Sequence, residues 1–176
     1  AMVRAYCDVD DQSAWSNTIT FTPTDAYSIT VNDGTTTNSY VPIYGLYVDE
    51  ITKSQFIIPA VNLAAMQFDT INKLTFYASN ENVSWGAAQF VVYLTETSET
   101  TLSNLADYSG MTQVYAGSLS ISNNKMEVTF TTPYMYLGGN LMIGFLQTAT
   151  GTFSNCNWHG TSATGASMGG YGTGIN

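Results

Sequence analysis

The chain has 176 residues and a formal net charge of −9 at pH 7, with four Lys and Arg residues against thirteen Asp and Glu. Its length suits one well-packed domain together with a fragment of another. The shortage of cations argues against a nucleic-acid partner, which is bound through basic side chains, and no apolar run approaches the roughly 18 residues of a membrane-spanning helix, so we expect no membrane insertion.

Strand-like runs recur along the chain, with alternating apolar residues or many β-branched and aromatic residues, whereas helical periodicity is almost absent. The predicted strands are Val3–Cys7, Trp15–Thr22, Tyr27–Asn32, Gln55–Ile58, Lys73–Ser79, Gln89–Glu96, Gln113–Ser122, Lys125–Thr131, Asn140–Gln147 and Phe153–His159. About eight strands from Tyr27 onward suit a jelly roll. We therefore expect an all-β fold, an antiparallel β-sandwich (jelly roll) with an additional N-terminal β-hairpin.

Turn residues mark several boundaries between these strands. Asn123 and Asn124 tolerate the positive φ of a type I′ turn, so a tight hairpin is predicted there. Pro59 is expected to end one strand and Pro133 to interrupt another, because proline cannot donate to a β-ladder.

Two other segments are predicted to lie outside the strands. The single helical candidate, Thr101–Tyr108, is interpreted as a surface turn. The glycine-rich stretch from Ala166 to Asn176 predicts a loop rather than a closing strand.

Acidic residues near the N-terminus raise the question of a metal. Asp8, Asp10 and Asp11 superficially resemble half of a calcium loop, but the stretch lacks the glycine and the distal glutamate of an EF-hand. A solvated hairpin turn explains these acids better. We expect no cofactor, although a structural calcium bound by Asp33, Asp49 or Glu50 with backbone carbonyls stays open.

The two cysteines, Cys7 and Cys156, lie near opposite ends of the chain. They allow one disulfide, since the first and last strands of a sandwich are often neighbours. Two buried thiols are the favoured alternative.

The N-terminal residues show a family resemblance. Val3-Arg-Ala-Tyr-Cys7, an acidic turn, Ser13-Ala-Trp-Ser16 and Thr18-Ile-Thr-Phe-Thr22 together resemble the closing hairpin of a bacterial fibronectin type III domain. The resemblance implies that residues 1–23 are the C-terminal hairpin of such a domain and that residues 24–176 form the jelly-roll module. It also implies that residues 3–7 pair with residues 15–22, with no ion in the turn.

The remainder resembles a module of secreted and cell-surface proteins of Bacteroidetes-type bacteria. The resemblance rests on Val31–Gly45, Lys53–Ile57, Leu74–Tyr77, Ser84-Trp-Gly86, Val92-Tyr-Leu94, Thr132-Pro-Tyr134 and Gly138–Leu141. It implies a non-catalytic β-sandwich in a secreted or cell-surface multidomain protein, with neighbouring domains of the same polypeptide as partners. It implies no particular ligand or binding residues.

Catalytic groupings are weak in this sequence. His159 is the only histidine, and no Gly-x-Ser-x-Gly motif accompanies it. Cys156 and His159 are three residues apart on one predicted strand, so they should point to opposite faces. Glu96 and Glu99 lie at a strand end, where solvated carboxylates are common. We expect a protein that is not an enzyme.

Carbohydrate binding suits the composition best, because sugars stack their C–H faces on aromatic rings and bond to polar side chains at the edges. Trp85 lies in a predicted turn, where a large side chain is less easily buried, and Trp158 lies at a strand end. The candidate binding residues are Trp85, Trp158, Tyr40, Tyr44, Tyr136 and Asn157. The expected partner is a polysaccharide or other glycan, and the alternative is an adhesion or spacer module without a glycan ligand.

Overall fold

The computed structural model describes residues 6–8, 11–12, 28–31 and 34–172. Within them lie three 3-10 helices and thirteen strands: β1 (Tyr6–Asp8), β2 (Asp11–Gln12), β3 (Thr36–Asn38), η1 (Gly45–Tyr47), β4 (Thr52–Ile58), η2 (Ala60–Met66), β5 (Thr70–Tyr77), β6 (Val83–Ser84), β7 (Gln89–Thr97), η3 (Tyr108–Gly110), β8 (Thr112–Gly117), β9 (Ser120–Ile121), β10 (Lys125–Met135), β11 (Asn140–Ala149), β12 (Trp158–Gly160) and β13 (Ser167–Tyr171).

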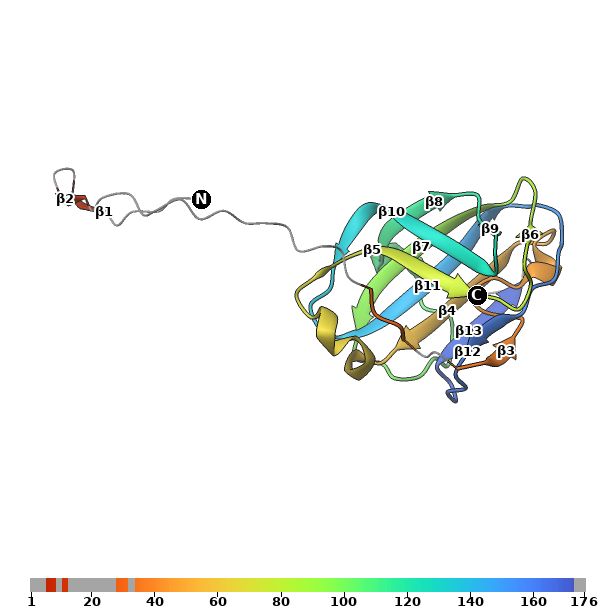
Figure 1. The fold of residues 1–176 in the computed structure, drawn as a ribbon, viewed down its shortest axis with the longest axis horizontal. Helices are drawn as coiled ribbons and strands as arrows, with labels where there is room; N and C mark the ends of the chain where they lie inside the picture. Colours follow the sequence, from red (N-terminus) through yellow and green to blue (C-terminus); the bar gives the residue numbers. More distant parts are fainter. Residues whose placement is uncertain (1–5, 9–10, 13–27, 32–33, 173–176) are drawn as a thin grey trace.

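The strands from β3 onward form two antiparallel layers. The larger layer is a five-stranded sheet in the order β13-β4-β11-β7-β8. The second layer contains the β5–β10 pair, which crosses in front of β7, β11 and β4 in Figure 1. A bridge between Ala78 and Trp158 joins the end of β5 to the β12–β3 pair. The predicted all-β antiparallel sandwich is therefore confirmed.

The strand connections give the sandwich its wrapped topology. β4 pairs with β11 in the larger layer, while β5 and β10, the neighbours of these strands in sequence, pair with each other in the second layer. The two segments β4–β5 and β10–β11 thus run side by side from one layer to the other. The strands between them in sequence extend the larger layer, where β7 pairs with β11 and β8 pairs with β7. This wrapping is characteristic of a jelly roll.

Side chains from both layers form one core. Along β10, Met126, Val128 and Phe130 are buried while the residues between them are exposed, as expected for a strand with one face on the core. Ile143 and Phe145 of β11 reach the same core from the facing layer. Each such side chain contributes roughly 1.5–3 kcal/mol by leaving water.

The outer face of the larger sheet is covered by the loop between β7 and β8. The buried Gln55 amide donates to the carbonyl of Ala106 (2.7 Å) and accepts from its N–H (2.6 Å). The Tyr108 hydroxyl donates to the carbonyl oxygens of Ser54 and Phe145, and its ring lies over Gly144, where a side chain would overlap it. This loop therefore occupies the central part of that face.

Local signals in the sequence placed several boundaries correctly. Asn123 and Asn124 have φ of 52° and 63°, and the backbone groups of Ser122 and Lys125 bond reciprocally across the turn. Pro59 follows the last residue of β4. The register of β10 shifts between Thr129 and Tyr134, around Pro133.

Other expectations were wrong. Ser167–Tyr171 forms an edge strand beside β4, although its glycines predicted a loop. The described residues 28–31 form no strand, and in the predicted strand Phe153–His159 only Trp158 and His159 are in strand conformation. By contrast, the interpretation of Thr101–Tyr108 as a surface turn is borne out as far as Asp107, and η3 begins at Tyr108.

The N-terminal acidic stretch forms a hairpin. β1 and β2 pair antiparallel, with Tyr6 opposite Gln12 and Asp8 opposite Asp11. Asp8 and Asp11, expected in the turn, are themselves paired residues of the two strands. Tyr6 was expected to pair within residues 15–22, and its pairing with Gln12 makes that part of the prediction wrong. Residues 3–5 and 15–22 lie outside the described residues.

Candidate functional site: a surface tyrosine cluster

Four tyrosines from distant parts of the sequence meet at one end of the sandwich, and we call Tyr40, Tyr44, Tyr47 and Tyr171 the tyrosine cluster. The ring centroids of Tyr40 and Tyr44, and those of Tyr44 and Tyr47, lie 4.8 Å apart. Tyr47 and Tyr171 stack at 3.5 Å with 14° between their planes. Tyr40 is 59% exposed and Tyr171 41% exposed, so the cluster presents aromatic surface to water.

Local chain geometry explains how these rings come together. The Asn38 side chain accepts from the N–H groups of Tyr40 and Val41, which fixes the turn before the cluster. The Tyr47 N–H donates to the Tyr44 carbonyl at the start of η1. Because residues three apart eclipse each other in a 3-10 helix, Tyr44 and Tyr47 lie on the same side.

Tyr171 reaches the cluster through the sheet. It is the last residue of β13 and lies opposite Thr52 at the start of β4. The N–H of Gly172 then donates to the carbonyls of Glu50 and Ile51, which holds the end of β13 against the loop that follows η1.

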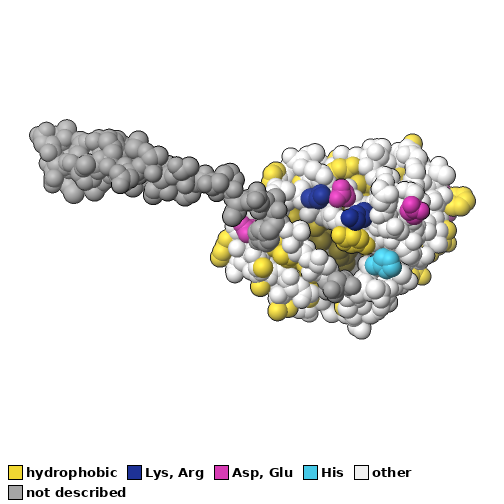
Figure 2. Space-filling view, in the orientation of Figure 1, with side chains coloured by type: hydrophobic (Ala, Val, Ile, Leu, Met, Phe, Trp, Pro, Cys, Tyr) yellow, Lys and Arg dark blue, Asp and Glu magenta, His cyan; other side chains and the backbone are white. Residues whose placement is uncertain are grey.

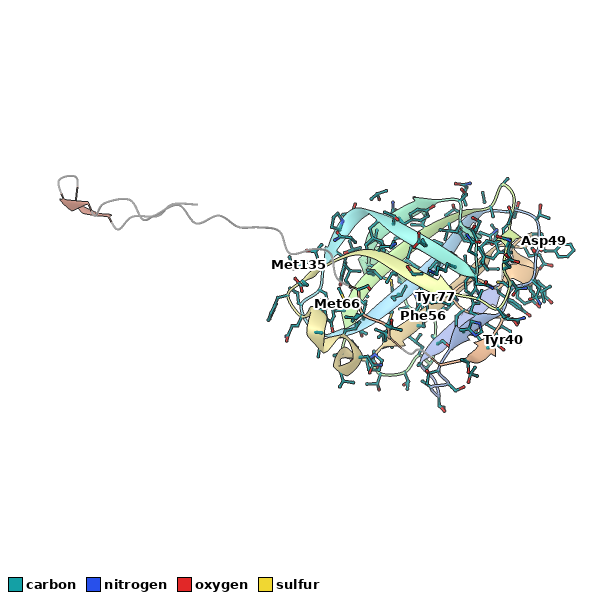
Figure 3. The ribbon with its side chains drawn as sticks, viewed as in Figure 1. Tyr40, Asp49, Phe56, Met66, Tyr77 and Met135 are labelled. Carbon is teal, nitrogen blue, oxygen red and sulfur yellow. The ribbon has the colours of Figure 1, made fainter. Side chains whose placement is uncertain are left out.

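A shallow open depression of about 310 Å³ adjoins the cluster. Leu46, Tyr47, Asp49, Glu50 and Phe153 line it. Phe153 is 60% exposed, and both carboxylates are exposed. In Figure 3, Tyr40 and Asp49 lie toward the same end of the sandwich, away from Met66 and Met135. Aromatic surface and acceptor groups are therefore adjacent.

Two buried tryptophans hold the loops of this site from beneath. The Trp158 indole N–H donates to the carbonyl of Ile43 (2.9 Å), beside Tyr44. The Trp85 indole N–H donates to the carbonyl of Ser154 (3.0 Å), beside Phe153. The two indoles pack with their centroids 6.3 Å apart. The loops that present Tyr44 and Phe153 thus rest on the hydrophobic core.

A buried glutamine fixes the rest of the loop after η1. The Gln147 amide nitrogen donates to the carbonyls of Val48 and Ala149, and its oxygen accepts from the N–H and hydroxyl of Thr52. Between these anchors Ile51 has a φ of 69°, a strained conformation for a β-branched residue. The site is therefore preorganised, which lowers the entropic cost of binding.

Three of the sequence-predicted binding residues are not at the surface. Trp85 and Trp158 are each 1% exposed, and Tyr136 is fully buried with its hydroxyl donating to the carbonyl of Gly139 (2.7 Å). The expectation that Trp85 resists burial in its turn was wrong, because the indole N–H finds the Ser154 carbonyl inside the core. These side chains support loops and offer no surface to a ligand.

The other three predicted residues lie in or beside the site. Tyr40 and Tyr44 belong to the tyrosine cluster. The Asn157 side-chain oxygen accepts from the hydroxyl of Ser39 (3.0 Å), next to Tyr40, and its backbone N–H donates to the Asn80 side chain. Asn157 is therefore close to the cluster, in a structural role.

The sequence analysis missed Tyr171, Phe153 and Leu46 as site residues. Tyr171 lies in a glycine-rich stretch that predicted a loop, and nothing local connects it with Tyr47, which is 124 positions away. For Phe153, the one signal in the sequence was the position of an aromatic residue within the polar stretch Ala149–Asn155.

Two hydroxyls of the cluster, those of Tyr44 and Tyr171, have a raised pKa and keep their protons at neutral pH. Partial removal from water, then the nearby Tyr40 and Tyr47, raises the pKa of Tyr44. A hydrogen bond with Tyr47 raises the pKa of Tyr171, and the Tyr47 and Glu50 charges act in the same direction. These groups can therefore both donate and accept hydrogen bonds.

The candidate catalytic and metal-binding side chains considered in the sequence analysis form no common site among the described residues. Cys156 is a free, buried thiol, and burial raises its pKa to about 12, whereas His159 on β12 is exposed. Among the described residues, no group of three or more His, Cys, Asp or Glu side chains is placed to hold a metal ion. Asp33 and the side chains of Cys7 and of the acids from Asp8 to Asp11 lie outside the described residues.

Comparison with known proteins gave no relative: no family model, curated protein or solved structure matches the chain. Within the described part of the chain, no helix has the combined length and apolarity that crossing a bilayer requires.

Proposed function

We propose that this protein is a non-catalytic carbohydrate-binding module that binds a glycan at the tyrosine cluster and the adjoining depression. The observation that supports this proposal is the contiguity of exposed aromatic rings with acceptor groups. Tyr40, Tyr171 and Phe153 present ring surface, and Asp49 and Glu50 lie beside them. Aromatic faces favour the C–H faces of sugars, and carboxylates accept from their hydroxyls.

The remaining surface is consistent with a secreted or cell-surface module. Figure 2 shows a face with few charged side chains, on which lysine and acidic side chains lie close together over β5 and β10. There Lys73 and Glu127 form an ion pair at 2.9 Å. We therefore keep the proposal of a multidomain extracellular protein, in which this module holds its neighbours near a polysaccharide.

Affinity electrophoresis in gels containing soluble neutral polysaccharides tests the proposal. The wild-type protein should be retarded by at least one glycan. Replacing both Tyr47 and Tyr171 with Ala should weaken retardation at least about tenfold, because stacked sugar–aromatic contacts contribute more than about 1.4 kcal/mol together. Circular dichroism should show that the double variant remains folded.

A matched control removes an exposed aromatic at the other end of the sandwich. Phe68 is 69% exposed and its backbone bonds to Tyr136, beyond the far end of β10. Its φ is 66°, and Asn tolerates that conformation, so Phe68→Asn should leave retardation unchanged. Absence of retardation on every glycan, with the protein folded, would reject carbohydrate binding.

A second candidate function is adhesion to another protein. It is favoured by a separate set of exposed apolar side chains at the end of the sandwich opposite the tyrosine cluster, namely Val61, Phe68, Met135 and Leu137. Such a patch favours protein contact over a purely inert spacer. Failure of every glycan to retard the folded protein would direct attention to this patch.

A further inference from the structure

We infer that the tyrosine site selects uncharged glycans and discriminates against polyanionic ones such as uronates and sulfated polysaccharides. The inference rests on the proposed function, and it concerns the substrate class of the same site.

The first observation is the sign of the charge around the depression. Asp49 and Glu50 are both exposed and both line it, next to Tyr47. Glu50 also lies close enough to Tyr171 to contribute to the raised pKa of that hydroxyl. A carboxylate or sulfate group on a bound sugar would therefore lie close to two negative charges.

The second observation is where the cations of the described residues lie. Lys73 pairs with Glu127, and Lys125 lies 5.7 Å above the ring of Tyr77, so both are engaged on the β5–β10 face. Lys53 follows Thr52, the partner of Tyr171, and alternation along β4 places its side chain on the opposite face of the sheet from Thr52. None of these lysines lines the depression.

The third observation is that the remaining polar groups suit neutral hydroxyls. The hydroxyls of Tyr44 and Tyr171 keep their protons, so they can donate as well as accept, and the carboxylates are strong acceptors. A sugar hydroxyl can donate to a carboxylate, whereas an anionic substituent can only repel it. Attraction to neutral sugars and repulsion of charged ones thus come from the same side chains.

Matched polymer pairs test this selectivity. Affinity electrophoresis would compare hydroxyethyl-cellulose with carboxymethyl-cellulose, dextran with dextran sulfate, and methyl-esterified with de-esterified galacturonan. At low salt the charged member should bind about fivefold or more weakly than its neutral partner, because two nearby charges act on it. The difference should decrease as salt screens these exposed charges.

A double variant links the selectivity to the site. Asp49→Asn with Glu50→Gln should bring the affinities for the two members of a pair closer together. Glu99→Gln, beyond the distal end of β7 near Asn140, should leave their ratio unchanged.

The outcomes separate the two claims. Equal or tighter binding of the charged members, or a ratio that the double variant does not change, would overturn the inference while leaving glycan binding intact. Failure of both neutral and charged members to bind would reject the proposed function, and the inference with it. Preferential binding of a neutral member that depends on Asp49 and Glu50 would support both.

Discussion

Gly45 lies where two loops of the site and the core come into contact. A Cβ atom there would overlap the carbonyl oxygen of Ser154 and would lie 3.0 Å from the Trp85 indole nitrogen and 3.1 Å from the Cys156 sulfur. The Ser154 N–H also donates to the Gly45 carbonyl (2.9 Å). The absence of a side chain at this one position therefore allows the Tyr44 loop to pack on the Phe153 loop.

Replacing Gly45 with Ala should lower the free energy of unfolding by about 2–4 kcal/mol, since the methyl group must displace backbone or a buried indole. Urea unfolding followed by tryptophan fluorescence measures the change. Gly160→Ala is the matched control, because no atom lies within 4 Å of the added methyl group. Similar losses in both variants would contradict the proposed close packing.

Cys156 gives a pH dependence whose sign follows from its burial. Removal from water raises the pKa of its thiol from 9.0 to about 12, so the folded state holds its proton more tightly than the unfolded state. This contribution to stability is complete below pH 9 and is lost as pH rises toward 12.

At pH 10 the loss from Cys156 should reach about 1 kcal/mol. Urea unfolding at pH 8 and pH 10 should therefore show a larger loss for the wild-type protein than for Cys156→Ala. An identical loss in both proteins would show that this thiol does not contribute to the alkaline destabilisation.

Among the elements, the hairpin between β9 and β10 is the one whose sequence determines its conformation most directly. Asn123 and Asn124 both have positive φ, as the type I′ turn requires. Replacing Asn123 with Val should cost about 1–2 kcal/mol, because a β-branched residue is strained in this conformation. Asn123→Gly should be nearly neutral in the same thermal or urea unfolding measurements, and equal destabilisation by both changes would contradict the turn assignment.

The sequence was informative where a local pattern determines the structure. The run Lys125–Thr131 was predicted as a strand and lies within β10, and the two asparagines predicted its turn. The sequence was uninformative where pairing between distant segments determines whether a segment forms a strand. β13 has two glycines and little intrinsic strand preference, and it becomes a strand because β4 offers a free edge.

The candidate site was predictable to the same limited extent. Tyr40 and Tyr44 lie in a long polar stretch, which suggested exposure; Tyr40 is exposed, whereas Tyr44 is half-buried. Trp85 also lies in a turn, but its burial depends on a carbonyl 69 positions away. No local pattern contains that information.

In the whole molecule, one core connects the two layers to the loops that carry Tyr44 and Phe153. Aromatic contacts run from Phe145 to Phe76, from Phe76 to Trp158 and from Trp158 to Trp85. Since the two tryptophans also bond to the loops, stability and loop position depend on the same side chains.

Trp158→Phe, compared with a variant elsewhere in the core, tests whether Trp158 both stabilises the fold and positions the Tyr44 loop. The change keeps a ring in the core but removes the donor to the Ile43 carbonyl, which should cost about 1–3 kcal/mol. Glycan affinity should also fall, because Tyr44 follows Ile43 directly. Leu94→Val, at a fully buried residue of β7 toward its end at Thr97, should destabilise the protein without changing affinity at temperatures where it remains folded. Unchanged affinity in Trp158→Phe would contradict the supporting role.

The edge position of β13 has one more consequence. Tyr171 ends a strand that pairs with only one neighbour, and such edges open locally more readily than the centre of a sheet. Each opening removes one ring from the tyrosine cluster, so a glycan that contacts Tyr171 must also hold β13 closed. Backbone amides of Ser167–Tyr171 should then exchange their hydrogens with solvent more slowly when the glycan is bound, and the end of the sheet would become an internal reporter of ligand occupancy.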